Sequence, residues 1–204
     1  MQASINTIPG YRVQEYLLVL PPQPELASRI SQAREQFAAE YDCQQARMGR
    51  PHIVLASFTQ YLMLEERLMN RLRLVAMGVT PFKVELRDFG SFPSHSIFFN
   101  VVSRVPVQGL VKRVRQETQR LMRLDEEHKP YFNLEPHIPL VRKLLPWQYE
   151  KGWMEFSQRH FSGRFIADSM VLLKRPLGEM KFQVARQFAF QNLPVFTRQG
   201  ELFA

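Results

Sequence analysis

The chain has 204 residues, 45% of them hydrophobic, and a formal net charge of +8 at pH 7. This hydrophobic fraction is ordinary for a globular protein and argues against extensive disorder. The single cysteine, Cys43, excludes an internal disulfide and provides no metal-ligand spacing.

The first half of the sequence alternates strand and helix signals. The first strand ends at Pro21-Pro22, and the helix after it opens at Pro24, where a missing N–H does no harm. Two later strands are separated by turn-type residues, which predicts a hairpin with a long loop. The expected strands are residues 12–20, 52–58, 82–86 and 95–102, and the expected helices are residues 24–41 and 61–77.

The second half largely repeats this order. A turn signal at residues 175–178 joins the last two strands. The expected helices are residues 106–124 and 146–161, and the expected strands are residues 134–141, 165–173 and 181–190. We therefore predict an α+β fold in which residues 1–204 form one bilobed, duplicated domain. The first lobe would cover roughly residues 11–105 and the second roughly 106–190, with strands free to exchange between lobes.

Nothing in the sequence indicates export or a membrane span. Residues 1–10 contain no basic start followed by an apolar run, so we expect no signal peptide. The longest apolar runs, such as residues 16–22, are too short to cross a bilayer. We expect a cytoplasmic protein without a membrane partner. Its basic charge suits polyanions such as RNA, DNA or nucleotides, although solubility alone could also explain it.

A histidine-bearing pentapeptide occurs twice. PHIVL occupies residues 51–55 and PHIPL occupies residues 136–140, so the two histidines lie 85 positions apart (137 − 52). Alternate side chains of a strand share a face, which places His52 with Val54 and His137 with Pro139. The Ile and Leu of each pentapeptide point to the other face, where they suit a core packed by helices. The histidines would then line the opposite surface and meet where two lobes face each other.

Two histidines across one cleft suit acid–base chemistry on a phosphodiester. A neutral imidazole can take a proton from water or a hydroxyl, and a protonated one can give a proton to the leaving oxygen. The alternative is that the two are unrelated histidines, each hydrogen-bonded on its own strand. Their matched context in a repeated order favours a shared site.

The layout resembles the 2H phosphoesterase superfamily, the group of 2′-5′ RNA ligase-like proteins and cyclic nucleotide phosphodiesterases. That family carries two His-x-Thr/Ser-x motifs on pseudo-symmetric lobes, and the resemblance covers nearly the whole chain. Arg142, five residues after His137, matches an arginine common after the second motif. The resemblance implies two antiparallel-rich sheets facing a central cleft, with helices on the outside.

The resemblance also implies an activity. The substrate would be a 2′,3′-cyclic phosphate or a 2′-5′ linkage at an RNA terminus or in a nucleotide. His52 and His137 would be the acid–base pair and Arg142 would contact the phosphate. No metal or organic cofactor is implied, and the oligomeric state is left open. The sequence contains no Gly-rich phosphate loop, so ATP-driven ligation is unsupported.

The sequence departs from the family pattern at the two hydroxyl positions. They hold Val54 and Pro139, which cannot donate a hydrogen bond to a phosphate oxygen. Losing one such donor costs about 10²–10³ in rate. The candidate replacements are Arg142, Lys143, Ser57 and Tyr131. Without replacements the protein would be a weak or inactive module that binds nucleotides or RNA, and a scaffold for protein partners is a third alternative.

Several other residues have two interpretations. Tyr131 and Phe132 could stack on a base, or could anchor a loop in the core. The basic helix over residues 112–123 could face RNA, or could simply be solvated. Three further histidines are expected outside the site: His95 at a solvent-facing strand end, His128 in a polar loop and His160 near a helix end, where it would be structural.

Overall fold

The structure is a computed structural model that describes residues 11–193. The expectation about a signal peptide falls on residues 1–10 and so lies outside the described residues. The helices are α1 (Pro24–Glu40), α2 (Glu65–Met77), α3 (Arg104–Met122) and α4 (Pro146–Phe156), with short 3₁₀ turns η3 (Gln44–Arg47) and η4 (Leu62–Leu64). The strands are β1 (Val13–Leu20), β2 (Ile53–Tyr61), β3 (Phe82–Phe92), β4 (Ser96–Val101), β5 (Tyr131–Phe132), β6 (His137–Arg142), β7 (Ser162–Ala167), β8 (Ser169–Pro176) and β9 (Gln183–Ala189).

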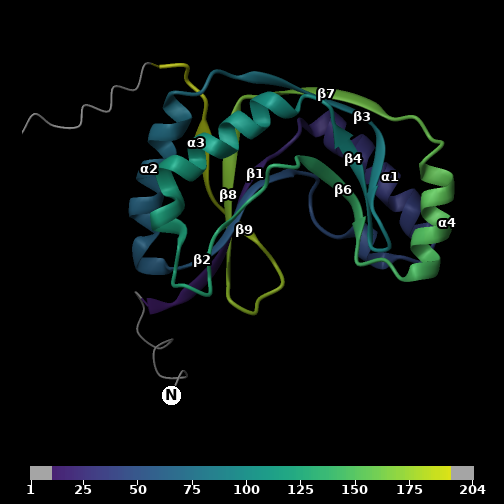
Figure 1. The fold of residues 1–204 in the computed structure, drawn as a ribbon, viewed down its shortest axis with the longest axis horizontal. Coiled ribbons are helices and arrows are strands. Elements are labelled where there is room, and N and C mark those ends of the chain that lie inside the picture. Colours follow the sequence, from purple (N-terminus) through teal and green to yellow (C-terminus); the bar gives the residue numbers. More distant parts are fainter. Residues whose placement is uncertain (1–10, 194–204) are drawn as a thin grey trace, which may run out of the picture.

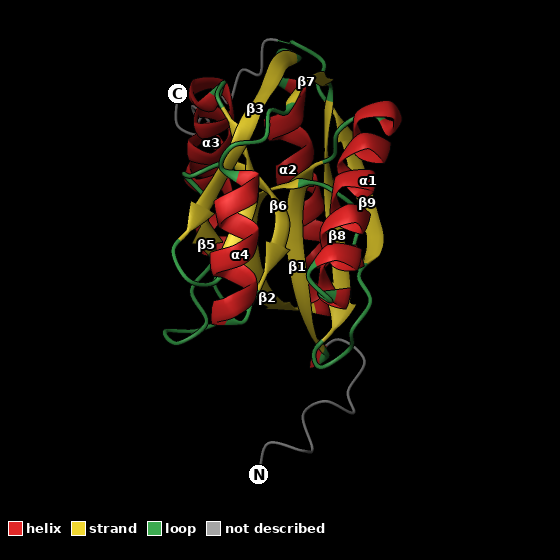
Figure 2. Cartoon of the chain, turned by 90° about the vertical axis from the view of Figure 1, so that its right-hand side faces the viewer, coloured by secondary structure: helices red, strands yellow, loops and turns green. Residues whose placement is uncertain are grey.

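The strands form two antiparallel sheets, which confirms the predicted α+β class. We call the five-stranded sheet β5-β2-β1-β8-β9 sheet A, and the four-stranded sheet β6-β4-β3-β7 sheet B. Helices α2 and α3 cover the outer side of sheet A, while α1 and α4 cover that of sheet B (Figure 1). Viewed from the α4 side, α4 lies in front of the strands and α2 lies behind them (Figure 2). Each sheet takes strands from both halves of the sequence.

The exchange of strands explains one wrong boundary. The predicted strand over residues 165–173 is two strands, β7 in sheet B and β8 in sheet A, separated at Asp168. Strand β7 pairs with β3, and β8 lies between β1 and β9. A polar residue within an apolar run does not break the run's pattern, so the pattern alone could not reveal that the chain changes sheet there.

The β3–β4 hairpin also differs from the expectation. Of the turn-type residues that suggested a long loop, residues 88–90 lie inside β3, which continues to Phe92 through a register shift between Leu86 and Phe89, while residues 93–94 lie in the turn. Asp88 takes a φ of 54° within this bulge, and its amide donates to the Phe161 carbonyl at 2.6 Å. A bulge absorbs one unpaired residue without ending the strand, so the loop between the strands is only a short turn.

The last predicted helix is too long and one strand was missed. Helix α4 ends at Phe156, so His160 lies in the loop after it rather than on a helical turn. The missed strand, β5, has two residues and pairs with β2 at the edge of sheet A. Such a short strand has no detectable periodicity. None of the helices among residues 11–193 is long and apolar enough to cross a membrane.

Candidate functional site

The two pentapeptides lie where the sheets approach each other, since β2 and β6 are in contact. Strand β2 begins directly after His52, and β6 begins at His137. Their isoleucines and leucines are almost fully buried, at no more than 1% exposed, whereas positions 52, 54, 137 and 139 are all partly exposed. The predicted alternation of faces is therefore present in both motifs.

A buried arginine that the sequence analysis did not single out joins the two motifs. Arg34 of α1 is only 6% exposed. Its Nε and Nη2 donate to the Pro139 carbonyl at 3.0 and 2.6 Å, and its Nη1 donates to the Gly49 carbonyl at 3.0 Å. The residues before the first motif are thus fixed against the middle of the second. The detectable signal was an arginine four positions after Ile30 on the apolar stripe of a predicted helix.

Asn133 makes a second connection, also missed from the sequence. Its Nδ2 donates to the Val54 carbonyl at 3.0 Å, and its backbone N–H donates to the Leu55 carbonyl at 2.9 Å. Its Oδ1 accepts the Glu135 amide at 3.1 Å. Residues 54–55 therefore lie beside the segment just before His137, while the carbonyls of Gly49 and Pro139 both accept hydrogen bonds from Arg34. The two motifs approach each other in an antiparallel sense.

His52 lies in a small basic pocket of about 210 Å³. The pocket is also lined by Arg34, Pro139, Arg142 and Lys143, together with residues of η3 and the loop after it. Burial lowers the pKa of His52 to about 4, with the positive charges of Arg34 and Arg142 adding to that effect and a hydrogen bond to the Arg50 backbone opposing it. At neutral pH the His52 imidazole is uncharged.

His137, like His52, is hydrogen-bonded to the backbone two residues earlier, in the segment that leads to its strand. Its Nδ1 donates to the Glu135 carbonyl at 2.7 Å, so the neutral ring leaves its Nε2 lone pair free. The rings of Phe92 and Phe98 pack against it at centroid distances of 5.2 and 4.9 Å. Burial lowers the pKa of His137, a hydrogen bond to the Glu135 backbone raises it, and Arg142 lowers it further. Each motif histidine thus bonds the backbone of the residue two positions before it.

This arrangement is suited to a phosphate. Two neutral imidazoles can act as bases, and the negative charge of a bound phosphate would favour protonation of one of them. Arg34 is a buried cation for which no carboxylate partner exists among residues 11–193. A buried charge is costly when unpaired, so an anion beside it would be stabilising.

The remaining predicted site residues divide into two groups. Pro139, Arg142 and Lys143 share the pocket with His52, and Val54 lies beside the segment that leads to His137. Tyr131 and Ser57 pair across β5 and β2 and line a separate groove of about 480 Å³ on sheet A, which does not include the motif histidines.

Tyr131 and Phe132 do not share one role. The side chain of Tyr131 is 60% exposed, and its hydroxyl donates to Asn133 Oδ1 at 3.4 Å. Phe132 is half-buried and packs against the core. The loop-anchoring interpretation therefore fits Phe132, while Tyr131 offers an exposed ring.

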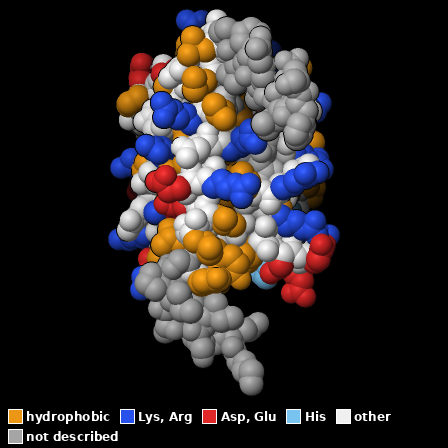
Figure 3. Space-filling view, turned by 90° about the vertical axis from the view of Figure 1, so that its left-hand side faces the viewer, with side chains coloured by type: hydrophobic (Ala, Val, Ile, Leu, Met, Phe, Trp, Pro, Cys, Tyr) orange, Lys and Arg blue, Asp and Glu red, His pale blue; other side chains and the backbone are white. Residues whose placement is uncertain are grey.

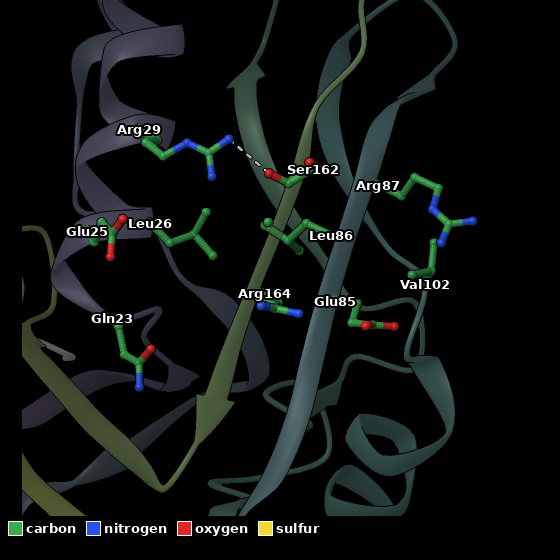
Figure 4. Close-up of a pocket in the computed structure, with 11 residues that line it drawn as sticks. Gln23, Glu25, Leu26, Arg29, Glu85, Leu86, Arg87, Val102, Ser162 and Arg164 are labelled. Atoms are coloured by element: carbon green, nitrogen blue, oxygen red, sulfur yellow. Dashed lines mark hydrogen bonds between the residues drawn. The ribbon is translucent and has the colours of Figure 1, made fainter.

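A larger cavity lies away from the histidines. It measures about 560 Å³ and lies between the start of α1 and strands β3 and β7 (Figure 4). Arg29 donates to the Ser162 carbonyl at its upper edge at 2.9 Å, and the other charged side chains around it are of both signs. Its lining contains no histidine and favours no particular ligand.

The other three histidines lie outside the motifs. His95 is exposed in the β3–β4 turn, His128 is exposed and bonds Asp125, and His160 is exposed beside Asp88. A structural role at a helix end was wrong for His160, because α4 ends before it. Within residues 11–193, no three His, Cys, Asp or Glu side chains group as a metal site would require.

A family profile described as the 2′-5′ RNA ligase superfamily matches residues 22–179. The chain belongs to this superfamily. Membership confirms the resemblance to the 2H phosphoesterases, and it rests on most of the chain rather than on the two pentapeptides alone. No curated protein matches the sequence.

Solved structures of this superfamily's fold are similar to the chain. Escherichia coli LigT complexed with 3′-AMP has a TM-score of 0.60 at 16% identity, covering 88% of this chain and 98% of that one. TT0787 of Thermus thermophilus has a TM-score of 0.58 at 18% identity, covering 87% and 98%. At these identities the likeness establishes the fold, including two antiparallel sheets with helices outside.

Proposed function

We propose that the protein is a phosphodiesterase that hydrolyses 2′,3′-cyclic phosphate or 2′-5′ phosphodiester bonds of RNA or nucleotides, using His52 and His137. The observation that carries the proposal is the matched pair of motif histidines. Each is hydrogen-bonded to the backbone of the residue two positions earlier, and the positive charge of Arg142 contributes to lowering the pKa of each. The LigT structures include complexes with 3′-AMP and with phosphate, which supports a phosphate-bearing ligand for this chain.

In this reaction one imidazole takes a proton from the attacking water. The water oxygen bonds to phosphorus, the P–O bond to the ribose oxygen breaks, and the second imidazole, as imidazolium, gives its proton to that oxygen. The low pKa of His52 favours it as the base in the free protein. A bound phosphate favours the protonated form of a neighbouring histidine, and His137 is opposed by Arg142 alone whereas His52 is opposed by Arg34 and Arg142, so His137 is the histidine that would carry the proton to be donated.

Arg34 and Arg142 supply charged donors beside Pro139, in place of the hydroxyl that this position lacks, whereas position 54 has no such replacement among residues 11–193. A guanidinium has five N–H groups, and Arg34 uses three of them on the Pro139 and Gly49 carbonyls. One N–H on each terminal nitrogen remains for a phosphate oxygen. Charged donors bind phosphate oxygens more strongly than the hydroxyls they would replace.

The test is hydrolysis of 2′,3′-cyclic nucleotides and of 2′-5′-linked dinucleotides by the wild type and by a His52→Ala/His137→Ala variant. Turnover that is lost in the double variant and kept in His95→Ala, an exposed histidine outside the site, supports the enzyme. If the folded wild type turns over no faster than the double variant, the hydrolase is refuted. Nucleotide affinity would then decide for the alternative, a binding module whose missing hydroxyls at positions 54 and 139 have abolished catalysis.

A further inference from the structure

A second groove, of about 480 Å³, lies between α3 and the edge strand β5. We call it the α3–β5 groove. It is lined by Arg115, Gln119, Arg120, Arg123, Lys129, Pro130, Tyr131 and Phe132. Half of these residues are basic and none is acidic. The view onto α2 and α3 shows Lys and Arg side chains gathered across the middle of this face, with hydrophobic patches above and below them (Figure 3).

The basic residues of the groove are not all equivalent. Arg123 and Lys129 both pair with Glu126, whose single negative charge balances one of their two positive charges. Arg115 and Arg120 are exposed, and no carboxylate lies within ion-pair distance of either among residues 11–193. Two unbalanced guanidinium groups, five positions apart on one helix, therefore remain for an external anion.

Aromatic rings accompany the charges. The guanidinium of Arg115 lies 6.0 Å from the centroid of the Phe132 ring. Tyr131 follows as an exposed ring at the sheet edge. A basic surface that offers exposed rings is typical of sites for single-stranded nucleic acid, because phosphates pair with the cations and bases stack on the rings.

The groove connects to the candidate site through Tyr131. This residue and Lys129 line both the α3–β5 groove and the groove on sheet A. The Tyr131 hydroxyl donates to Asn133, whose side chain in turn holds the Val54 carbonyl of the first motif. Tyr131 is also close enough to Arg142 for the two side chains to interact electrostatically, so a polymer that passes Tyr131 runs from the side of the candidate site to the outer surface of α3.

From this juxtaposition we propose that the α3–β5 groove binds the RNA strand that leads to the reacting phosphate, so that the substrate is an oligonucleotide end rather than a free nucleotide. Arg115 and Arg120 contact backbone phosphates, and Tyr131 stacks on a base. The proposal rests on the phosphodiesterase function for the identity of the strand as RNA, but its test measures binding and not turnover.

The experiment compares the affinity of the full chain for a labelled ten-nucleotide RNA ending in a 3′-phosphate, by fluorescence anisotropy at several salt concentrations. The test variant is Arg115→Gln/Arg120→Gln. The control is Arg73→Gln/Lys112→Gln, which removes two exposed charges from α2 and α3 outside the groove. The test variant should bind at least about tenfold more weakly, and its log–log salt slope should fall by about 1.4, which corresponds to two lost phosphate contacts.

Tyr131 supplies an independent readout. Tyr131→Ala should weaken RNA binding about tenfold or more, whereas Tyr131→Phe, which keeps the ring, should stay close to the wild type. The wild type should also bind the ten-nucleotide RNA more tightly than a nucleoside 3′-monophosphate.

Three results would overturn the proposal: equal losses in the test and control pairs, no dependence on strand length, or no RNA binding at all. The last would favour an acidic protein as the occupant of the groove. The experiment measures RNA binding and not turnover. The affinities can therefore still be interpreted if the His52→Ala/His137→Ala assay refutes the hydrolase. Conversely, hydrolysis of cyclic mononucleotides without RNA binding would support the proposed enzyme and refute the proposal that the α3–β5 groove binds an RNA strand.

Discussion

Replacing His52 by Gln should flatten the dependence of stability on pH below neutrality. Burial and two nearby arginines hold the pKa of His52 at about 4 in the folded protein, against a usual value of 6.5. The unfolded chain therefore takes up a proton first as the pH falls. Stability conferred by the neutral His52 is present above pH 6.5 and is lost progressively between pH 6.5 and 4.

The size of the effect follows from the shift. A difference of 6.5 − 4 pKa units corresponds to about 3 kcal/mol, at about 1.4 kcal/mol per unit, and this is an upper figure because the side chain is only partly buried. That is a large part of the about 5–15 kcal/mol that typically separates folded and unfolded states. Gln does not titrate, so His52→Gln should lose up to about 3 kcal/mol less than the wild type between pH 7 and pH 4.

Urea unfolding followed by circular dichroism at pH 7, 5.5 and 4 measures this difference. The contribution of His137, whose pKa is lowered in the same direction, is present in both proteins and cancels. His95→Gln, at the exposed β3–β4 turn, is the control. Parallel stability curves for the wild type and His52→Gln would refute the argument that His52 is held neutral beside Arg34 and Arg142.

Three further substitutions test other parts of the structure. Arg34→Met should weaken the binding of inorganic phosphate, measured by calorimetry, about tenfold or more. The phosphate affinity of Arg34→Lys should lie between those of the wild type and Arg34→Met, because an ammonium cannot reproduce the planar fork of a guanidinium. Unchanged binding in both variants would exclude Arg34 from the anion site. Val54→Thr restores a donor of nearly the same shape and should raise the hydrolysis rate about tenfold or more; no change would mean that the phosphate does not reach position 54. Gly90→Ala should destabilise the fold by about 1–3 kcal/mol in thermal unfolding, because the new Cβ would lie 2.6 Å from the Phe98 ring. The control is Gly109→Ala in α3, where a Cβ meets nothing within 4 Å and the substitution should be stabilising.

Much of the fold was predictable because its signals are local. The helices show apolar stripes, Pro24 and Gly78 mark ends, and the two pentapeptides mark matched strands. The failures occur where local pattern is insensitive to tertiary context. An alternating run cannot reveal that the chain changes sheets at Asp168, and turn-type residues at 88–90 fit a bulge as well as a loop.

The candidate site was predictable only in part. The motif histidines, Arg142 and the replaced hydroxyl positions could be read from the sequence because they lie within two short segments. Arg34 and Asn133 could not, since their importance comes from backbone carbonyls 105 and 79 positions away in the chain. A hydrogen bond from a side chain to a distant backbone leaves no residue pair to recognise in a single sequence.

Pro139 shows how the lost hydroxyl and the buried arginine are related. Proline has no N–H, and it is tolerated here because β6 is the edge strand of sheet B and its pairing with β4 shifts register beside this residue. Its carbonyl accepts two bonds from Arg34, at 3.0 and 2.6 Å. The carbonyl thus fixes the guanidinium plane between the two motifs, and a cation held there can act on a phosphate at a place where the family uses a neutral hydroxyl. On this argument Pro139→Thr alone should improve catalysis less than Val54→Thr, because the second motif already has its donor.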